Sequence, residues 1–437
     1  LEKKLPTSLT LFFFFFPFSP LFFFFFFFFF NSAMDSFSMF LNPYMNAHQQ
    51  SSIVEILALS TLVPLLFVMR HSLGFNYHHH NGGEFRSSAL WIYFSRLIMD
   101  FVFLIVPMLL IFTMEVACLC ILAVDFEIFP RRHAKSRMYG ISLMDLGVGS
   151  FALANAVVSK QARGISSLSL KDASGAIIPP LAVGFGRLIL TKSVHYGVPA
   201  GEYGVHWNFF FTLAALAMLA SFIRIPTKYS AISGLLILIG YQCWLSKGLN
   251  SYLLSNTRGD DIVSQNKEGL FSLLGFWGMY LIGIQLGNYL FFGRQLPSIN
   301  NELAASNKWI KIKVSCLSVI FWLITIVLDK HVESISRRMC NLAYVTLILA
   351  ENLQVLAILM VSDSLMESKT SILEEAVNRS LLATFLVANV LTGLVNMFMD
   401  TKSASPMVAL SILLAYAFLT SIAAAIPHFY GFRLKFW

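Results

Sequence analysis

Long apolar stretches recur along almost the whole chain and are separated by short polar connections. Apolar runs near 20 residues match the length of a helix that crosses the hydrocarbon core of a bilayer. Because these runs are continuous rather than alternating, they indicate helices and not barrel strands. The pattern predicts spans near 53–70, 99–124, 140–158, 178–192, 208–224, 231–247, 270–292, 310–328, 341–361, 381–399 and 406–426. We therefore expect an all-α, polytopic transmembrane helix bundle of roughly 11 to 13 spans.

The first 33 residues differ from the other apolar stretches. Residues 11–30, "LFFFFFPFSPLFFFFFFFFF", are almost pure phenylalanine, and the first methionine is Met34. A pyrimidine-rich leader translated in frame gives this composition. We interpret residues 1–33 as a translated leader or gene-model artefact, with a signal sequence or an extra span as the alternative. Residues 34–437 are expected to form a single integral-membrane domain.

The composition agrees with a membrane protein. Hydrophobic residues make up 57% of the chain and charged residues 12%, whereas soluble domains carry about 25% charged residues. The net charge of +8 reflects basic loops, which set topology in membrane proteins. No basic domain stands apart from the spans, so nucleic-acid binding is not expected. The chain has no Walker motif and no Gly-x-Ser-x-Gly motif, which argues against ATP-driven transport and α/β-hydrolase chemistry.

The segment "DFEIFPRRHAK", residues 125–135, places several charges directly after an apolar run. A carboxylate at a membrane edge is costly, so Asp125 is a candidate for function. Partial burial raises the pKa of a carboxyl group and makes it a usable base. Pro130 disfavours a continuous helix, and a bend there would bring Asp125 and Lys135 together. The alternative is a positive loop that anchors a helix end.

Further polar residues lie inside or beside the predicted spans. Asp145 lies within a span beside Gly147 and Gly149, and an intramembrane carboxylate should face the bundle interior. His206 is a candidate base, or it belongs to an interfacial aromatic belt. Paired arginines suit phosphate groups and also suit the setting of topology. The candidates for substrate binding are Asp145, His206, Asn208, Asn266, Arg337, Arg338, Asn389 and Asn396. No metal site is expected, because the histidines at 78–80 lack metal-ligand spacing.

Six stretches together point to one protein family. They are "VDFEIFPRRHAKSRMYGISLMDLGVGSF", "EYGVHWNFFFTLAAL", "NKEGLFSLLGFWGMYL", "ISRRMCNLAYV", "LVANVLTGLVN" and the terminal "FRLKFW". They resemble the GPI-inositol acyltransferases, which are the fungal GPI-anchored wall transfer protein and its animal counterpart, PIG-W. The terminal stretch looks like the plant branch. The resemblance runs from about residue 34 to residue 437.

This resemblance implies a multi-pass enzyme of the endoplasmic reticulum membrane with no permanently bound cofactor. Its substrates would be acyl-CoA, typically palmitoyl-CoA, and glucosaminyl-phosphatidylinositol, whose inositol ring receives the acyl chain. The Asp and Lys of the family's D-x9-K stretch look like the catalytic pair, and they match Asp125 and Lys135. Arg131 and Arg132 would then bind phosphates of coenzyme A or of the phosphoinositide.

Three other functions fit part of the pattern. A lipid or solute transporter would line its path with Asp145, His206 and Asn389, although the sequence shows no two related halves. An acyltransferase that uses an intramembrane histidine would depend on His206 and not on Asp125. A non-catalytic assembly partner would tolerate substitution at the charged positions.

Overall fold

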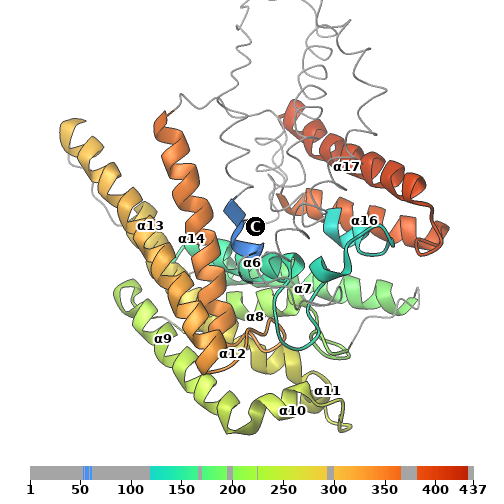
Figure 1. Ribbon diagram of the computed structural model, residues 1–437, viewed down its shortest axis with the longest axis horizontal. Coiled ribbons are helices and arrows are strands. Elements are labelled where there is room, and N and C mark those ends of the chain that lie inside the picture. Colours follow the sequence, from blue (N-terminus) through green and yellow to red (C-terminus); the bar gives the residue numbers. More distant parts are fainter. Residues whose placement is uncertain are drawn as a thin grey trace, which may run out of the picture. The chain divides into compact units, whose positions relative to one another are not determined.

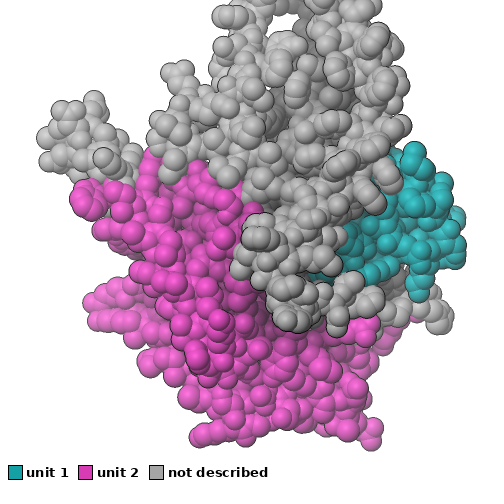
Figure 2. All heavy atoms as spheres, in the orientation of Figure 1, with its two compact units in different colours: residues 1–49, 62–132, 366–435 teal, residues 50–61, 133–365, 436–437 magenta. Residues whose placement is uncertain are grey.

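The computed structural model describes residues 53–61 except 54 and 59, 119–165, 170–193, 200–223, 225–292, 300–365 and 381–431. The chain divides into two compact units, which Figure 2 colours separately. Among the described residues, unit 1 holds 119–132 and 381–431, and unit 2 holds 53–61 and 133–365. The expected leader, residues 1–33, lies outside the described residues. A single domain over 34–437 stays a prediction.

Helices of very different length build unit 2. They are α6 (Leu143–Val157), α7 (Leu170–Ser193), α8 (Phe209–Phe222), α9 (Thr227–Trp244), the π-helix η2 (Leu245–Leu249), α10 (Asn250–Leu254), α11 (Ile262–Gln265), α12 (Lys267–Gly287), the π-helix η3 (Asn288–Phe292), α13 (Asn300–His331) and α14 (Leu342–Leu365). Helix α13 packs beside α14, α12 beside α9, and α7 beside α8 (Figure 1).

Unit 1 pairs helix α16 (Leu381–Phe398) with helix α17 (Pro406–Phe429). The short 3-10 helix η1 (Arg131–His133) begins in unit 1 and ends where unit 2 begins. Leu122, in the helical segment 119–123, and Phe126, in the turn that follows it, are 0% exposed and share an apolar cluster with Ala388, Ala409 and Tyr416. This cluster fixes residues 122–126 against α16 and α17.

Nine helices of the described residues coincide with predicted spans. Five are long and apolar enough to cross a membrane, namely Thr227–Leu254, Lys267–Phe292, Trp309–His331, Leu342–Met360 and Pro406–Phe429. Four shorter apolar helices cover Leu143–Val157, Ala173–Ile189, Phe209–Phe222 and Ala383–Phe398. The all-α polytopic membrane fold is confirmed. The predicted spans near 53–70 and 99–124 lie mostly outside the described residues, so the total of roughly 11 to 13 spans stays a prediction.

The core of unit 2 forms where α6, α12 and α14 meet. Helix α14 is buried on nearly every side between residues 343 and 350, as expected of a helix that is apolar all round. Glycines of α12 let its neighbours approach closely. Gly275 lies against the backbone of Cys340, and Gly283 lies against Leu153 and Ala156 of α6. Small residues on α12 therefore position the segment that precedes α14.

The variant Gly275→Ala is expected to destabilise unit 2 by about 1–3 kcal/mol. A Cβ at this position would collide with the backbone carbonyl of Cys340. Gly147→Ala on α6 is the matched control, because a Cβ there meets nothing within 4 Å. Thermal unfolding of both variants in one detergent measures the effect. Equal unfolding midpoints for the two variants would contradict the close packing.

Candidate functional site

Asp125 and Lys135 are held by separate sets of partners. Asp125 belongs to unit 1, where the Asn396 amide on α16 donates a hydrogen bond to Asp125 Oδ2 at 2.7 Å. Lys135 belongs to unit 2, where its Nζ lies 2.8 Å from Glu202 Oε1. Because the two residues belong to different units, their action as one catalytic pair stays a prediction.

The residues around Asp125 show how its turn is built. Arg131 lies in η1, and its guanidinium donates to the carbonyl oxygens of Val124 at 2.8 Å and Phe126 at 3.4 Å. These bonds close the turn in which Asp125 lies. The neighbouring Arg132 is half-buried, and this burial lowers the pKa of its guanidinium. The two arginines predicted to bind phosphate are therefore placed differently, with Arg131 the more exposed.

Three polar residues follow one face of α16, as the i, i+3, i+7 spacing predicts. The Asn396 amide donates to Asp125. The Thr392 hydroxyl donates to the Ala388 carbonyl at 2.9 Å and to the Tyr416 hydroxyl of α17 at 3.3 Å. The Asn389 amide donates within its own helix, to the Phe385 carbonyl at 2.7 Å. The Asn396 side chain thus contacts the candidate base.

Asp145 lies at the start of α6 and is fully buried. Its Oδ2 accepts hydrogen bonds from the backbone N–H of Ser136 at 3.1 Å and of Ser142 at 3.0 Å. The Ser142 hydroxyl donates to the same oxygen at 2.9 Å. Arg337 Nε lies 2.7 Å from Asp145 Oδ1. The predicted inward orientation of Asp145 is confirmed, and these contacts occupy both of its carboxylate oxygens.

Arg337 connects Asp145 to Glu202. Its Nη2 lies 3.7 Å from Glu202 Oε1, and its guanidinium carbon lies 5.9 Å from the centre of the Tyr203 ring. Burial raises the pKa of Glu202, but the positive charges of Lys135 and Arg337 outweigh that effect and hold the pKa below its usual value. Burial lowers the pKa of Arg337, but the surrounding acidic groups, Asp145 foremost and then Tyr203, Glu202 and Tyr344, together raise it by more, so the guanidinium keeps its charge.

The lowered pKa of Glu202 predicts a pH-dependent contribution to stability. This contribution is complete above the ordinary value of 4.5 and is lost as the pH falls through the lowered pKa of the folded protein. We expect the difference in unfolding midpoint between wild type and Glu202→Gln to be largest near neutral pH and to shrink in acid. Thermal unfolding of both proteins in detergent at a series of pH values measures this difference in midpoint. A difference independent of pH would contradict the ion pairs at Glu202.

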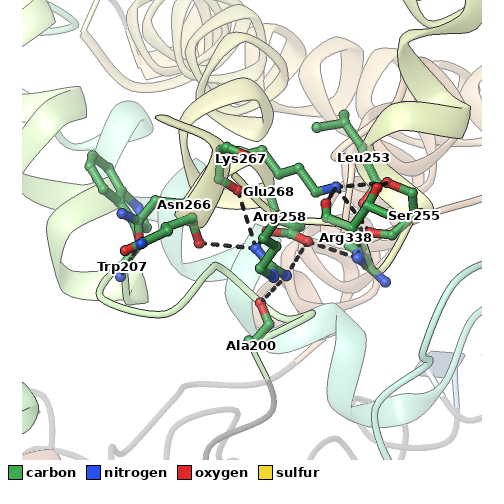
Figure 3. Close-up of polar contacts among 12 residues, drawn as sticks. Ala200, Trp207, Leu253, Ser255, Arg258, Asn266, Lys267, Glu268 and Arg338 are labelled. Carbon is green, nitrogen blue, oxygen red and sulfur yellow. Dashed lines mark hydrogen bonds and ion pairs between the residues drawn. The ribbon is translucent and has the colours of Figure 1, made fainter. Parts of the chain in front are cut away.

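A second set of buried charges surrounds Glu268, which is 0% exposed (Figure 3). Arg258 forms a two-pronged contact with Glu268, at 2.7 Å to Oε1 and 3.0 Å to Oε2. Arg338 Nη2 lies 2.8 Å from the same Oε1 and also donates to the Leu253 carbonyl at 2.8 Å. Glu268 therefore holds two guanidinium groups. Arg337 and Arg338 are adjacent, so the turn before α14 contributes one guanidinium group to each of the two sets of charges.

The side chains of Asn208 and Asn266, two of the residues predicted to bind substrate, form hydrogen bonds with backbone groups. Asn266 Oδ1 accepts the backbone N–H of His206 at 2.8 Å and of Trp207 at 3.0 Å. Asn208 caps α8 by accepting the N–H of Phe210 at 3.0 Å, and its amide donates to the Gly184 carbonyl at 2.9 Å. These contacts hold the 206–210 segment in place. Contacts of His206, Asn208 and Asn266 with substrate stay predictions.

Comparison with known proteins identifies the family. Residues 111–426 match the GWT1 family. The chain belongs to the GWT1 family. An uncharacterized protein of Arabidopsis thaliana is 54% identical over 326 residues, which is 74% of this chain and 73% of that protein. The phosphatidylinositol-glycan biosynthesis class W protein of Dictyostelium discoideum is 34% identical over 375 residues, 75% and 74% of the two chains. The mouse glucosaminyl-phosphatidylinositol-acyltransferase PIGW is 31% identical over 371 residues, 73% and 72% of the two chains.

The six stretches quoted in the sequence analysis contain most of the charged residues of the site, but Glu202, Glu268 and Arg258 are not among the predicted site residues. Glu202 belongs to a polar cluster at a span entry, and Glu268 lies in the polar cap of a span. Arg258 lies in a connection that the sequence presents as merely polar. A carboxylate directly before an apolar run is the available signal for Glu202 and Glu268, because burying such a group requires a cation.

Proposed function

We propose that this GWT1-family chain is an O-acyltransferase of GPI-anchor biosynthesis. It transfers a fatty acyl chain, typically palmitoyl, from acyl-CoA to the inositol ring of glucosaminyl-phosphatidylinositol. The similarity to the mouse glucosaminyl-phosphatidylinositol-acyltransferase, over 73% of this chain and 72% of the mouse protein, carries the proposal. The apolar helices and the phosphatidylinositol-glycan relative support a place in the endoplasmic reticulum membrane.

In the proposed reaction an inositol hydroxyl attacks the thioester carbonyl of acyl-CoA. A C–O bond forms, the C–S bond breaks, and coenzyme A leaves as the thiol once it has taken up a proton. Asp125 accepts the proton of the hydroxyl, a role that typically accelerates a reaction by about 10²–10⁴-fold. The Asn396 amide, 2.7 Å from Asp125 Oδ2, fixes the orientation of this carboxylate.

Basic side chains have two roles in the proposed mechanism, oxyanion stabilisation and phosphate binding. The Lys135 ammonium stabilises the negative charge that develops on the carbonyl oxygen during attack. Its side chain is 35% exposed, so it is accessible to a substrate while Glu202 holds it. Arg131 and Arg132 bind phosphate groups of coenzyme A or of the phosphoinositide. The exposed position of Arg131 supports this assignment.

The test is acyl transfer in membranes from cells that lack their own inositol acyltransferase. The full chain is expressed and supplied with glucosaminyl-phosphatidylinositol and labelled palmitoyl-CoA. We expect labelled lipid product from wild type and from His206→Ala. Absence of product from a well-expressed, membrane-inserted wild type would contradict the proposed function. Loss of product in His206→Ala would instead favour an acyltransferase that uses an intramembrane histidine.

A further inference from the structure

The Lys135 ammonium belongs to a closed ring of polar contacts. Glu202 Oε1 lies 2.8 Å from Lys135 Nζ and 3.7 Å from Arg337 Nη2. Arg337 Nε in turn lies 2.7 Å from Asp145 Oδ1. Asp145 also accepts the backbone N–H of Ser136, the residue next to Lys135, at 3.1 Å. We call these five residues the Lys135 ring.

The ring has no net charge, and the exposure of its charged side chains increases from Asp145 to Lys135. Lys135 and Arg337 supply two positive charges, and Glu202 and Asp145 supply two negative charges. Exposure of the side chain is 0% at Asp145, 3% at Arg337, 16% at Glu202 and 35% at Lys135. Buried ions persist only where partners compensate for their lost hydration. The buried members of the ring therefore have fixed positions, and the exposed ammonium takes its position from them.

Four separate segments contribute to the Lys135 ring. They are the loop that carries Lys135, the start of α6, the turn before α8 and the turn before α14. Two further bonds tie the first of these segments to the last. Gly140 N–H donates to the Ile335 carbonyl at 2.8 Å, and the Ser336 hydroxyl donates to the Met138 carbonyl at 2.7 Å. Tertiary packing, and not local sequence, determines where Lys135 lies.

We propose that Glu202 is the positioning residue of Lys135 and that Arg337 and Asp145 hold Glu202 in place. This inference rests on the proposed function, in which Lys135 stabilises the oxyanion. Glu202 keeps the ammonium in one orientation before the substrate binds, and such preorganised charge contributes to catalysis. The contacts of Asp145 and Arg337 support this role over direct binding of substrate, since both side chains are at most 3% exposed.

The inference is tested by a double-mutant cycle in the acyl-transfer assay. The variants are Glu202→Gln, Lys135→Met and the double variant, with Asp260→Asn, an exposed carboxylate, as the control. We expect Glu202→Gln to lower kcat by about 10–100-fold, the range seen when groups that orient metal ligands are removed. The KM for each substrate should stay nearly unchanged. In the Lys135→Met background, Glu202→Gln should lower kcat by less than about twofold.

Each outcome of the cycle supports or overturns the inference. Losses that multiply in the double variant would show that Glu202 acts independently of Lys135 and would overturn it. An unchanged kcat in Glu202→Gln would also overturn it. If Glu202→Gln does not insert into membranes, Glu202→Asp keeps the charge but withdraws it from Lys135, and the same non-additive loss is expected. An inactive wild type would overturn the proposed function, whereas an active wild type with multiplicative losses would overturn this inference alone.

Discussion

Asp125→Asn is expected to lower the rate of acyl transfer by about 10²–10⁴-fold, because the variant cannot accept the proton of the inositol hydroxyl. Asparagine has nearly the same shape as aspartate, so the apolar cluster beneath the turn, formed by Leu122, Phe126 and residues of α16 and α17, is retained. The measurement is the initial rate of product formation in membranes, normalised to the amount of inserted protein.

The matched control for this prediction is Asp400→Asn. Asp400 follows α16 in the same unit, is exposed, and bonds to Ser403 and to the backbone of Lys402. It has the same charge as Asp125 but lies in an exposed turn, so its change should leave the rate near that of wild type. Near-normal turnover by Asp125→Asn would show that another residue is the base.

Glu268→Gln is expected to destabilise the protein by about 3–5 kcal/mol, the usual effect of breaking a buried ion pair. Glu268 is fully buried and faces the guanidinium groups of Arg258 and Arg338, at 2.7 Å and 2.8 Å. Loss of its charge leaves the buried Arg338 and the partly buried Arg258 without their shared carboxylate. Thermal unfolding in detergent, compared with wild type in the same detergent, measures the change.

Asp260→Asn is the control for Glu268→Gln. Asp260 lies in the connection between α10 and α11 and is exposed, so its charge has little effect on folding. Its unfolding midpoint should match that of wild type. A midpoint for Glu268→Gln within the error of the Asp260→Asn value would show that the Glu268 contacts contribute little to stability.

The helices were largely predictable from the sequence, because each span needs only a local run of apolar residues. All predicted spans from 140–158 onward coincide with helices among the described residues. The burial of Asp145 was predictable for a related reason, since a carboxylate in an apolar helix must face protein. The partner of Asp145 was not predictable, because Arg337 lies far along the chain and many other basic residues could have filled this role.

The contacts of the candidate site depend on tertiary packing. No spacing rule joins Lys135 to Glu202, or Arg338 to Glu268, since these pairs come from segments brought together by the helices between them. Asn266 and Asn208 show that one sequence pattern is compatible with two different roles. Polar residues before an apolar helix predict substrate binding, which stays a prediction, and in the structure their side chains bind backbone groups of the 206–210 segment at the start of α8. Capping chemistry and ligand chemistry use the same residue types.

The position of the transferred acyl chain is measured by fragmentation mass spectrometry of the lipid that membranes containing the full chain form from glucosaminyl-phosphatidylinositol and palmitoyl-CoA. We expect wild type to add one palmitoyl group, and we expect this group to stay with the inositol fragment. Membranes containing Asp125→Asn should leave the lipid largely unmodified. An unmodified lipid from wild type, or a palmitoyl group on the glucosamine fragment, would show that the chain is not an inositol acyltransferase.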